Sequence, residues 1–119
     1  MRNFSVANVI VLPKTKVYTA EEYLAFEEKS EYKNEYVGGN IFQMAGGTEA
    51  HNDITLNAAS QLKTKLRGKC KTFASEMKVW VDAAETFFYP DVTVVCGERK
   101  FYKDRRDIVE NPVLLVEVL

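Results

Sequence analysis

Two acidic residues lie inside apolar segments of the sequence, where an ionised carboxylate is costly to bury. Asp91 follows Pro90 at the start of VTVV, and Glu117 interrupts the run VLLVEVL. Such carboxylates are usually paired or bind a cation. If the two segments are neighbouring strands, both side chains can project from one sheet face into a shared site. Carboxylate, water and phosphate oxygens suit Mg²⁺ or Mn²⁺, and a cation held there favours hydrolysis of a phosphodiester.

Two other interpretations of these acids stay open on spacing alone. Asp91 could cap a turn and Glu117 could lie at a solvated strand end, which is the commoner outcome for a short motif. The pair could also be the general acid and base of a glycosidase, although nothing else in the sequence resembles a sugar-binding platform. The metal site therefore depends on what the surrounding elements bring together.

The first half of the sequence predicts a helix and a hairpin. Thr19 with Glu22 forms a capping box, which predicts a helix that begins there and fades near Ser30. Gly38 and Gly39 separate two short apolar runs, and glycine supplies the positive φ that a two-residue hairpin turn needs. Residues 1–17 show no clear period and are expected to form an irregular lead-in, with a short strand near Val9–Leu12.

A second helix is predicted from Thr48 to Arg67, with Gly68 as its stop. Its apolar residues recur every four positions along one stripe: Ala50, Ile54, Ala58, Leu62 and Leu66. The second half then turns to strands, namely an extended segment over residues 73–81 bent near Ser75, the strand YPDVTVVCG and the strand PVLLVEVL. The last is apolar at nearly every position, which is typical of a strand covered on both faces. Between these two, residues 97–111 are expected to be a polar connection.

Composition limits the class of protein. The chain has 119 residues, 46% hydrophobic and 28% charged, which suits one soluble globular domain. A net charge of −1 gives no global basic field, so nucleic-acid contact would need a local patch. No apolar run is long enough to span a membrane, and no signal-peptide pattern is present. Cys70 and Cys96 lack metal-ligand spacing and are expected to be reduced thiols in a cytoplasmic protein.

The string PD, a 25-residue gap and then ExL resembles the PD-(D/E)XK nuclease superfamily. The match is closer to its Uma-type restriction endonuclease family, carried by EYVGGNIFQMAGGTEAHN, SEMKVWV, YPDVTVVCG and NPVLLVEVL in this order. The resemblance implies a restriction-endonuclease-like α+β domain over residues 18–119, with flanking helices on a mixed sheet. It implies a metal-dependent DNA endonuclease that binds Mg²⁺ or Mn²⁺ at Asp91 and Glu117, and Glu35 as a third catalytic acid.

The sequence also departs from the family pattern. Leu119 stands where the superfamily motif has its catalytic lysine, and the last helix and strand of the core are missing, as in a chain truncated at its C-terminus. The alternative function is therefore a non-catalytic nuclease remnant that binds nucleic acid or self-associates. An uncovered apolar strand pairs with other chains, so a homo-oligomer is expected. The backbone carbonyl of Val118 is a further candidate ligand.

Lesser candidates each have a structural alternative. His51 matches the family's HN pair and could contact phosphate or position water, although a single histidine at a helix start is more often structural. Glu76 could join the outer shell of the metal or face outward. Lys78 could replace the missing lysine, or be a solvated strand residue. Five basic residues within nine positions are candidates for phosphate contact or an ordinary solvated helix end: Lys63, Lys65, Arg67, Lys69 and Lys71.

Overall fold

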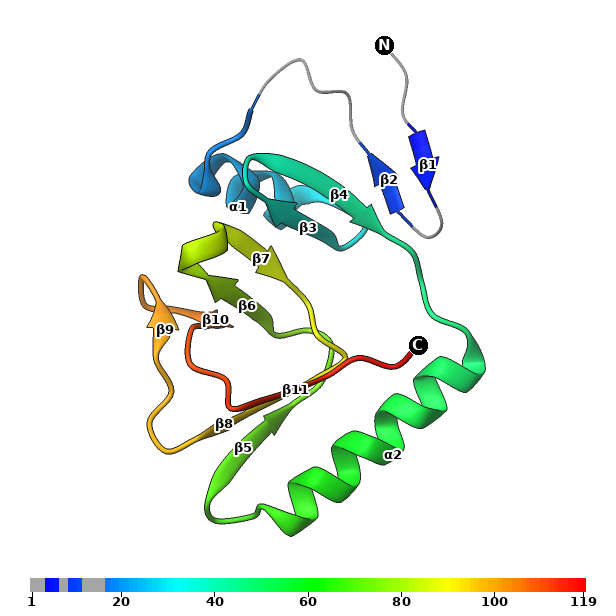
Figure 1. The fold of residues 1–119 in the computed structure, drawn as a ribbon, viewed down its shortest axis with the longest axis vertical. Coiled ribbons are helices and arrows are strands. Elements are labelled where there is room, and N and C mark those ends of the chain that lie inside the picture. Colours follow the sequence, from blue (N-terminus) through cyan, green and yellow to red (C-terminus); the bar gives the residue numbers. More distant parts are fainter. Residues whose placement is uncertain (1–3, 7–8, 12–16) are drawn as a thin grey trace. The chain divides into compact units, whose positions relative to one another are not determined.

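A computed structural model describes residues 4–6, 9–11 and 17–119. This part of the chain is α+β, with two α-helices and a mixed set of strands (Figure 1). The chain divides into two compact units, which are described separately below. The first unit comprises Met1–Gly46 and Val81–Phe88, and the second comprises Gly47–Trp80 and Tyr89–Leu119. Leu12 and the rest of residues 12–16, where part of the predicted lead-in falls, lie outside the described residues.

The first unit is an antiparallel arrangement of strands in the order β1-β2-β4-β3-β7. The strands are β1 (Phe4–Val6), β2 (Val9–Val11), β3 (Asn34–Val37), β4 (Asn40–Met44) and β7 (Thr86–Phe88). A short 3₁₀ helix, η1 (Asp82–Ala84), precedes β7. The predicted hairpin is confirmed, because β3 and β4 pair across Gly38 and Gly39, whose φ angles are 52° and 97°.

Helix α1 (Ala20–Lys29) packs on β3 and contributes Tyr23 to the aromatic core of the first unit (Figure 1). Tyr23 is fully buried, and its ring centroid lies 5.3 Å from those of both Tyr36 and Phe87. The helix begins as predicted, since both hydrogen bonds of the capping box are present: the Thr19 amide donates to the Glu22 side chain, and the Glu22 amide donates to the Thr19 side chain. A local signal at the N-cap thus sets where this helix starts.

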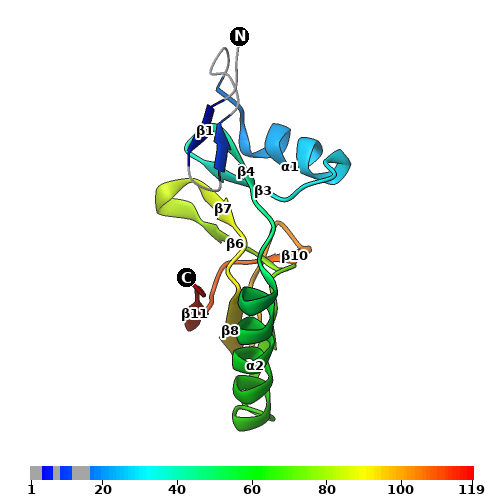
Figure 2. The same cartoon turned by 90° about the vertical axis from the view of Figure 1, so that its right-hand side faces the viewer.

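The second unit contains helix α2 (Glu49–Lys65) and two groups of strands. Its strands are β5 (Cys70–Phe73), β6 (Lys78–Val81), β8 (Val92–Cys96), β9 (Phe101–Tyr102), β10 (Arg105–Val109) and β11 (Leu114–Val116). β11, β8 and β5 form a three-stranded antiparallel sheet with β8 in the middle. β10 pairs in parallel with β6 and antiparallel with β9. Figures 1 and 2 both show α2 running alongside β5 and β8.

The prediction of a polar connection over residues 97–111 is wrong, because β9 and β10 lie in it. Their turn is formed by Lys103 and Asp104, both with positive φ, so no glycine marks it in the sequence. Ile108 and Val109 are fully buried although charged residues precede them. The charged residues left no apolar pattern that would indicate β10, because its buried residues both lie at its C-terminal end.

The predicted apolar stripe of α2 is also partly wrong. Thr48 caps the helix by accepting a hydrogen bond from the His51 amide. The buried residue of the helix is Thr55, whereas Ala50 is exposed and the Ile54 side chain is 52% exposed. The face toward the sheet is therefore displaced by one residue from the predicted stripe at this end of the helix. Small polar residues there carry little periodic signal.

Cys70 and Cys96 form a disulfide, so the prediction of two reduced thiols is wrong. The two residues are direct partners in the ladder between β5 and β8, and their Cα atoms lie 4.0 Å apart. They are 26 residues apart in sequence. Pairing between these distant strands places them together, which spacing motifs do not reveal.

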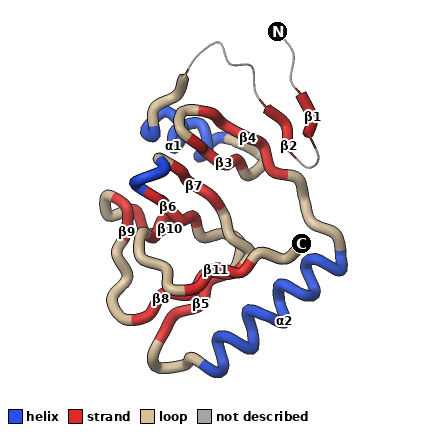
Figure 3. The backbone as a smooth tube through the Cα atoms, in the orientation of Figure 1, coloured by secondary structure: helices blue, strands red, loops and turns tan. Residues whose placement is uncertain are grey.

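β11 is an exposed edge strand, which contradicts the prediction of a strand covered on both faces. Leu114 is 42% exposed and Leu115 is 39% exposed, and adjacent strand residues point to opposite faces. Beyond Val116 the chain continues as a loop to Leu119 (Figure 3). Among the described residues, no helix is long and apolar enough to cross a membrane.

Candidate active site

The two acids singled out by the sequence flank the adjacent strands β8 and β11, because Asp91 directly precedes β8 and Glu117 directly follows β11. The ladder pairs Val116 with Val92, and its antiparallel register, continued by one step, sets Glu117 opposite Asp91. Residues directly opposed in an antiparallel pair have their side chains on the same face, with Cβ atoms about 5 Å apart. If this register continues past Val92 and Val116, both carboxylates lie on one side of the sheet.

Asp91 is held by two hydrogen bonds to the same oxygen. The backbone amide of Val118 donates to Asp91 Oδ2 over 2.7 Å, and His51 Nε2 lies 3.1 Å from that atom. The Asp91 side chain is only 13% exposed. Within the described residues, Asp91 Oδ1 accepts no hydrogen bond. One oxygen of this carboxylate is thus fixed, and the other is open to a ligand.

His51 reaches Asp91 from the first turn of α2. Its backbone is fixed by the Thr48 cap, and its ring packs against Gly47. The ring atom Nδ1 is buried and has no hydrogen-bond partner within the described residues. α2 also contacts β5 and β8, and Thr93 of β8 is fully buried.

Glu117 is in a different environment. Its side chain is exposed, and it lies one residue past the end of β11. The Val118 amide shows that the chain still runs beside Asp91 at this point, although regular pairing has ended. The carbonyl of Val118 was the predicted further ligand, but the contact that the structure shows is made by its amide.

The donor set fits a magnesium-type cation that also binds substrate. No group of three or more His, Cys, Asp or Glu side chains within the described residues could enclose a metal by itself. Mg²⁺, however, is usually bound by one or two carboxylates together with waters and substrate phosphates. The open Oδ1 of Asp91 and the exposed Glu117 carboxylate meet that requirement.

Lys78 is buried, so the prediction of a solvated strand lysine is wrong. Its Nζ lies 2.9 Å from Asp107 Oδ2 and 5.1 Å from the ring centroid of Tyr89. Burial acts to raise the pKa of Asp107, but the hydrogen bond and charge of Lys78 outweigh it and lower that pKa below its ordinary value. Lys78 is thus engaged by Asp107, which sequence reasoning did not single out. Glu76 lies exposed in the turn before β6.

Glu35, the third predicted acid, belongs to β3 of the first unit. It is half-buried, and no hydrogen bond or ion pair to it occurs within the described residues. Burial raises the pKa of Glu35 above its ordinary value of 4.5. Its strand neighbours Asn34 and Tyr36 are buried and point to the opposite face. This carboxylate therefore lies on the face of β3 away from those two side chains.

The five predicted nucleic-acid-binding residues lie in one stretch of the second unit. They occupy the end of α2, the turn after it and the start of β5, and all are exposed. Lys69 and Lys71 also line an open groove with Gly68, Gly97 and Arg99. Arg99 was not predicted for this role, because in sequence it belongs to the charged segment after β8.

The sequence of the chain matches a known family over most of its length. Residues 20–119 match the sequence profile of Uma2, described as "Putative restriction endonuclease". The chain therefore belongs to the Uma2 family, and this family fits the PD-(D/E)XK superfamily.

Two relatives come from Synechocystis sp. "Uncharacterized protein sll1609" is 38% identical over 112 residues, which are 93% of this chain and 63% of that protein. "Uncharacterized protein slr1290" is 34% identical over 102 residues, which are 83% of this chain and 52% of that protein. The chain thus spans between half and two thirds of the length of these relatives. No solved structure gives a significant match.

Proposed function

We propose that this chain is a metal-dependent DNA endonuclease that hydrolyses phosphodiester bonds. The observation that carries the proposal is that Asp91 and Glu117 lie next to the paired residues Val92 and Val116 at one end of β8 and β11, with Asp91 Oδ1 open. Membership of the Uma2 family supports nuclease chemistry. Two carboxylates and a substrate phosphate are suitable ligands for Mg²⁺ or Mn²⁺, which is the proposed cofactor.

The residues of the site have separate roles in this proposal. A bound divalent cation would neutralise the scissile phosphate and lower the pKa of an attacking water. Asp91 supplies a fixed carboxylate, and Glu117 supplies a second one on a strand end that can adjust to substrate. Glu35 is the third acid that family resemblance adds, and its raised pKa keeps it nearer to accepting a proton than an exposed glutamate.

DNA would be bound through its backbone. Lys63, Lys65, Arg67, Lys69 and Lys71 are exposed cations, and neutralising phosphates with such residues supplies most non-specific affinity for DNA. We expect DNA binding to weaken steeply as salt concentration rises. Replacing Lys69 and Lys71 together with alanine should reduce the slope of that dependence by about 2. An unchanged slope would place the DNA contact elsewhere.

The rate of cleavage should be low, because no lysine stands at the superfamily position. Losing one preorganised electrostatic group typically costs a factor of about 100 to 1,000 in rate. Lys78 is the stand-in candidate, although Asp107 holds it in this structure. If Lys78 serves, Lys78→Ala should abolish residual cleavage, whereas Asp107→Asn should preserve it.

The test measures Mn²⁺ binding and plasmid nicking by the same set of variants. Binding should disappear in Asp91→Asn and weaken in Glu117→Gln, whereas Asp53→Asn, an exposed acid on α2, should behave as the unchanged chain. Nicking should require Mn²⁺ or Mg²⁺ and should be lost in both site variants. Mn²⁺ binding that survives Asp91→Asn would refute the proposed metal site.

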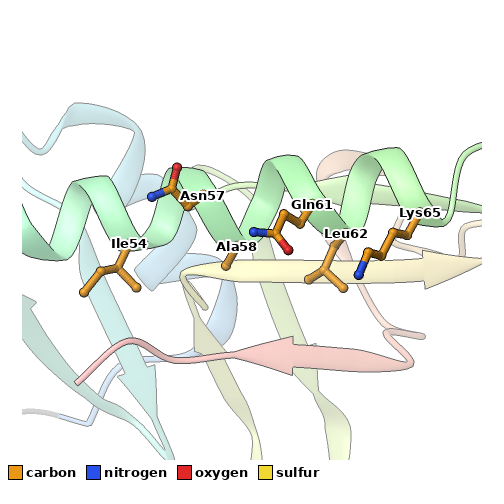
Figure 4. A pocket seen from close by; sticks show the side chains of 6 residues that line it. All are labelled: Ile54, Asn57, Ala58, Gln61, Leu62 and Lys65. Atoms are coloured by element: carbon orange, nitrogen blue, oxygen red, sulfur yellow. The ribbon is translucent and has the colours of Figure 1, made fainter.

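The alternative function is a non-catalytic domain that binds nucleic acid or self-associates. β11 is an edge strand with exposed Leu114 and Leu115. Ile54, Ala58 and Leu62 line one side of α2 beside an open groove, together with Asn57, Gln61 and Lys65 (Figure 4). Apolar edges of this kind pair with other chains, so we propose that a second copy of the chain covers β11.

Sedimentation tests self-association, and nicking then separates the two functions. We expect a dimer or larger species that dissociates when Leu115→Lys places a charge on the edge strand, with Lys100→Ala as an exposed control outside the strand. A monomer at high concentration would contradict self-association. A dimer that binds Mn²⁺ and DNA but does not nick would favour the non-catalytic alternative.

The compartment in the proposal is the cytoplasm, where the chain would meet DNA. The Cys70–Cys96 disulfide is uncommon in that compartment in most organisms. Trapping thiols in freshly lysed cells would measure how much of the chain is oxidised. A fully oxidised population would argue against a cytoplasmic location.

A further inference from the structure

The contact between His51 and Asp91 is more specific than expected for a histidine with a purely structural role. His51 Nε2 and the Val118 amide converge on the same atom, Asp91 Oδ2, at 3.1 Å and 2.7 Å. A backbone amide can only donate, and the carboxylate can only accept when ionised. The geometry therefore assigns the hydrogen of the imidazole to Nε2, where it completes a pair of donors on one oxygen.

The other side of the ring shows how His51 is held in place. Nδ1 is buried without a hydrogen-bond partner in the described part of the chain. A Cβ added at Gly47 would lie 2.8 Å from this atom, closer than real side chains approach. The ring is thus wedged between the Gly47 backbone and Asp91, and the Thr48 cap fixes the backbone that carries it.

We propose that His51 is a positioning residue for the metal site. By donating from Nε2 to Asp91 Oδ2, it fixes the rotation of the carboxylate so that Oδ1 presents a lone pair to the divalent cation. This inference rests on the proposed function of Asp91 as a metal ligand. It assigns His51 no contact with the cation or the phosphate.

Loss of the His51 hydrogen bond should lower the affinity for the cation. A carboxylate ligand that rotates freely must be ordered when the cation binds, and hydrogen bonds from neighbouring groups remove that cost. Replacing such partners typically lowers metal affinity by a factor of about 10 to 100. The other donor, the Val118 amide, belongs to a chain segment without regular strand pairing. Most of the ordering of the Asp91 carboxylate should therefore come from His51 on α2.

The matched variants follow from the space around the ring. His51→Ala removes the donor, whereas the side-chain amide of His51→Gln can place an N–H near the position of Nε2. Gly47→Ala leaves His51 present but forces the ring to move. Gly46→Ala is the control, because a Cβ at Gly46 meets no atom within 4 Å.

The measurement is Mn²⁺ affinity by electron paramagnetic resonance, with thermal melts to show that each variant folds. We expect His51→Ala and Gly47→Ala to bind Mn²⁺ about 10- to 100-fold more weakly, and His51→Gln and Gly46→Ala to bind within about threefold of the unchanged chain. In the metal-free protein, hydrogen exchange of the Val118 amide should be faster in His51→Ala.

The outcomes separate this inference from the proposed function. Equal Mn²⁺ affinity in the unchanged chain, His51→Ala and Gly47→Ala would overturn the positioning role but keep the metal site. Hyperfine coupling between bound Mn²⁺ and an imidazole nitrogen, lost in His51→Gln, would make His51 a direct ligand and also overturn it. A chain that binds no Mn²⁺ would overturn both.

Discussion

β8 and β11 lie side by side in one sheet and carry one acid each, but their environments are opposite. Val92, Thr93, Val94 and Val95 of β8 are all buried, whereas Leu114 and Leu115 of β11 are exposed. Asp91 is accordingly held by packing and by two donors, while Glu117 follows a strand with one neighbour. The proposed site thus combines a carboxylate that is 13% exposed with one whose residue is exposed.

The largest effect should come from placing a charge in each strand. Val94→Asp puts a carboxylate at a position that is 1% exposed, and we expect a loss of at least about 4 kcal/mol in the free energy of unfolding. Leu115→Asp, on the exposed strand, should cost less than about 1 kcal/mol. Denaturant unfolding followed by circular dichroism measures both. Similar losses in the two variants would abolish the contrast between the strands.

A second prediction concerns how β8 is held by its two neighbours. β5 is joined to it by the Cys70–Cys96 disulfide, which closes a 26-residue separation, whereas β11 is joined by hydrogen bonds alone. Closing a loop of this length contributes about 3.5 kcal/mol in the chain-entropy estimate. The Cys70→Ser/Cys96→Ser double variant should lose that amount in denaturant unfolding. The unchanged chain in reductant should match the double variant, and if oxidation adds no stability the prediction fails.

A third change tests the link between Asp91 and the segment after β11. Val118→Pro removes the amide that donates to Asp91 Oδ2, so an ionised, largely buried carboxylate loses a partner. We expect a loss of about 1 to 2 kcal/mol in the free energy of unfolding. Val118→Ala keeps the amide and is the control, with a change within about 0.5 kcal/mol. Equal effects of proline and alanine would show that this hydrogen bond contributes nothing.

The smallest effect concerns the pH dependence of stability that the half-buried Glu35 causes. Burial raises the pKa of Glu35 above 4.5, so the folded state holds this proton more tightly than the unfolded chain. The resulting destabilisation is present at neutral pH and disappears as pH falls below 4.5. Glu35→Gln should therefore stabilise the protein slightly at pH 7, by less than about 1 kcal/mol, and not at pH 4. Thermal melting measures both values, and an equal effect of Glu35→Gln at pH 7 and pH 4 would contradict this prediction.

Local signals predicted those parts of the fold that local chemistry determines. The capping box at Thr19, the turn at Gly38-Gly39 and the start of α2 near Thr48 all depend on residues within a few positions of each other. The turn at Lys103 and Asp104 was missed, because residues other than glycine adopt positive φ there. Burial of β11 was overestimated, because apolar composition does not reveal whether a neighbour covers it.

The site was predicted in its residue types but not in its contacts. Asp91 and Glu117 could be singled out, since acids inside apolar runs are conspicuous. The partner of His51 is 40 residues away and that of Lys78 is 29 residues away. No periodicity links such positions, because their contacts arise only when α2, β6, β8 and β10 have assembled. Polar partners in long-range pairs are therefore the part that sequence patterns miss.

The Cys70–Cys96 disulfide also changes what a protease can do to this molecule. Residues 71–95 form a covalently closed loop, which contains η1 and its exposed residues Asp82 and Ala84. A single cut there would leave His51 on one fragment, and Asp91 with Glu117 on the other, still joined through sulfur. The nicked molecule would gain only the mass of one water and would separate into two chains only after reduction. The covalent continuity of the candidate site thus does not depend on an intact backbone.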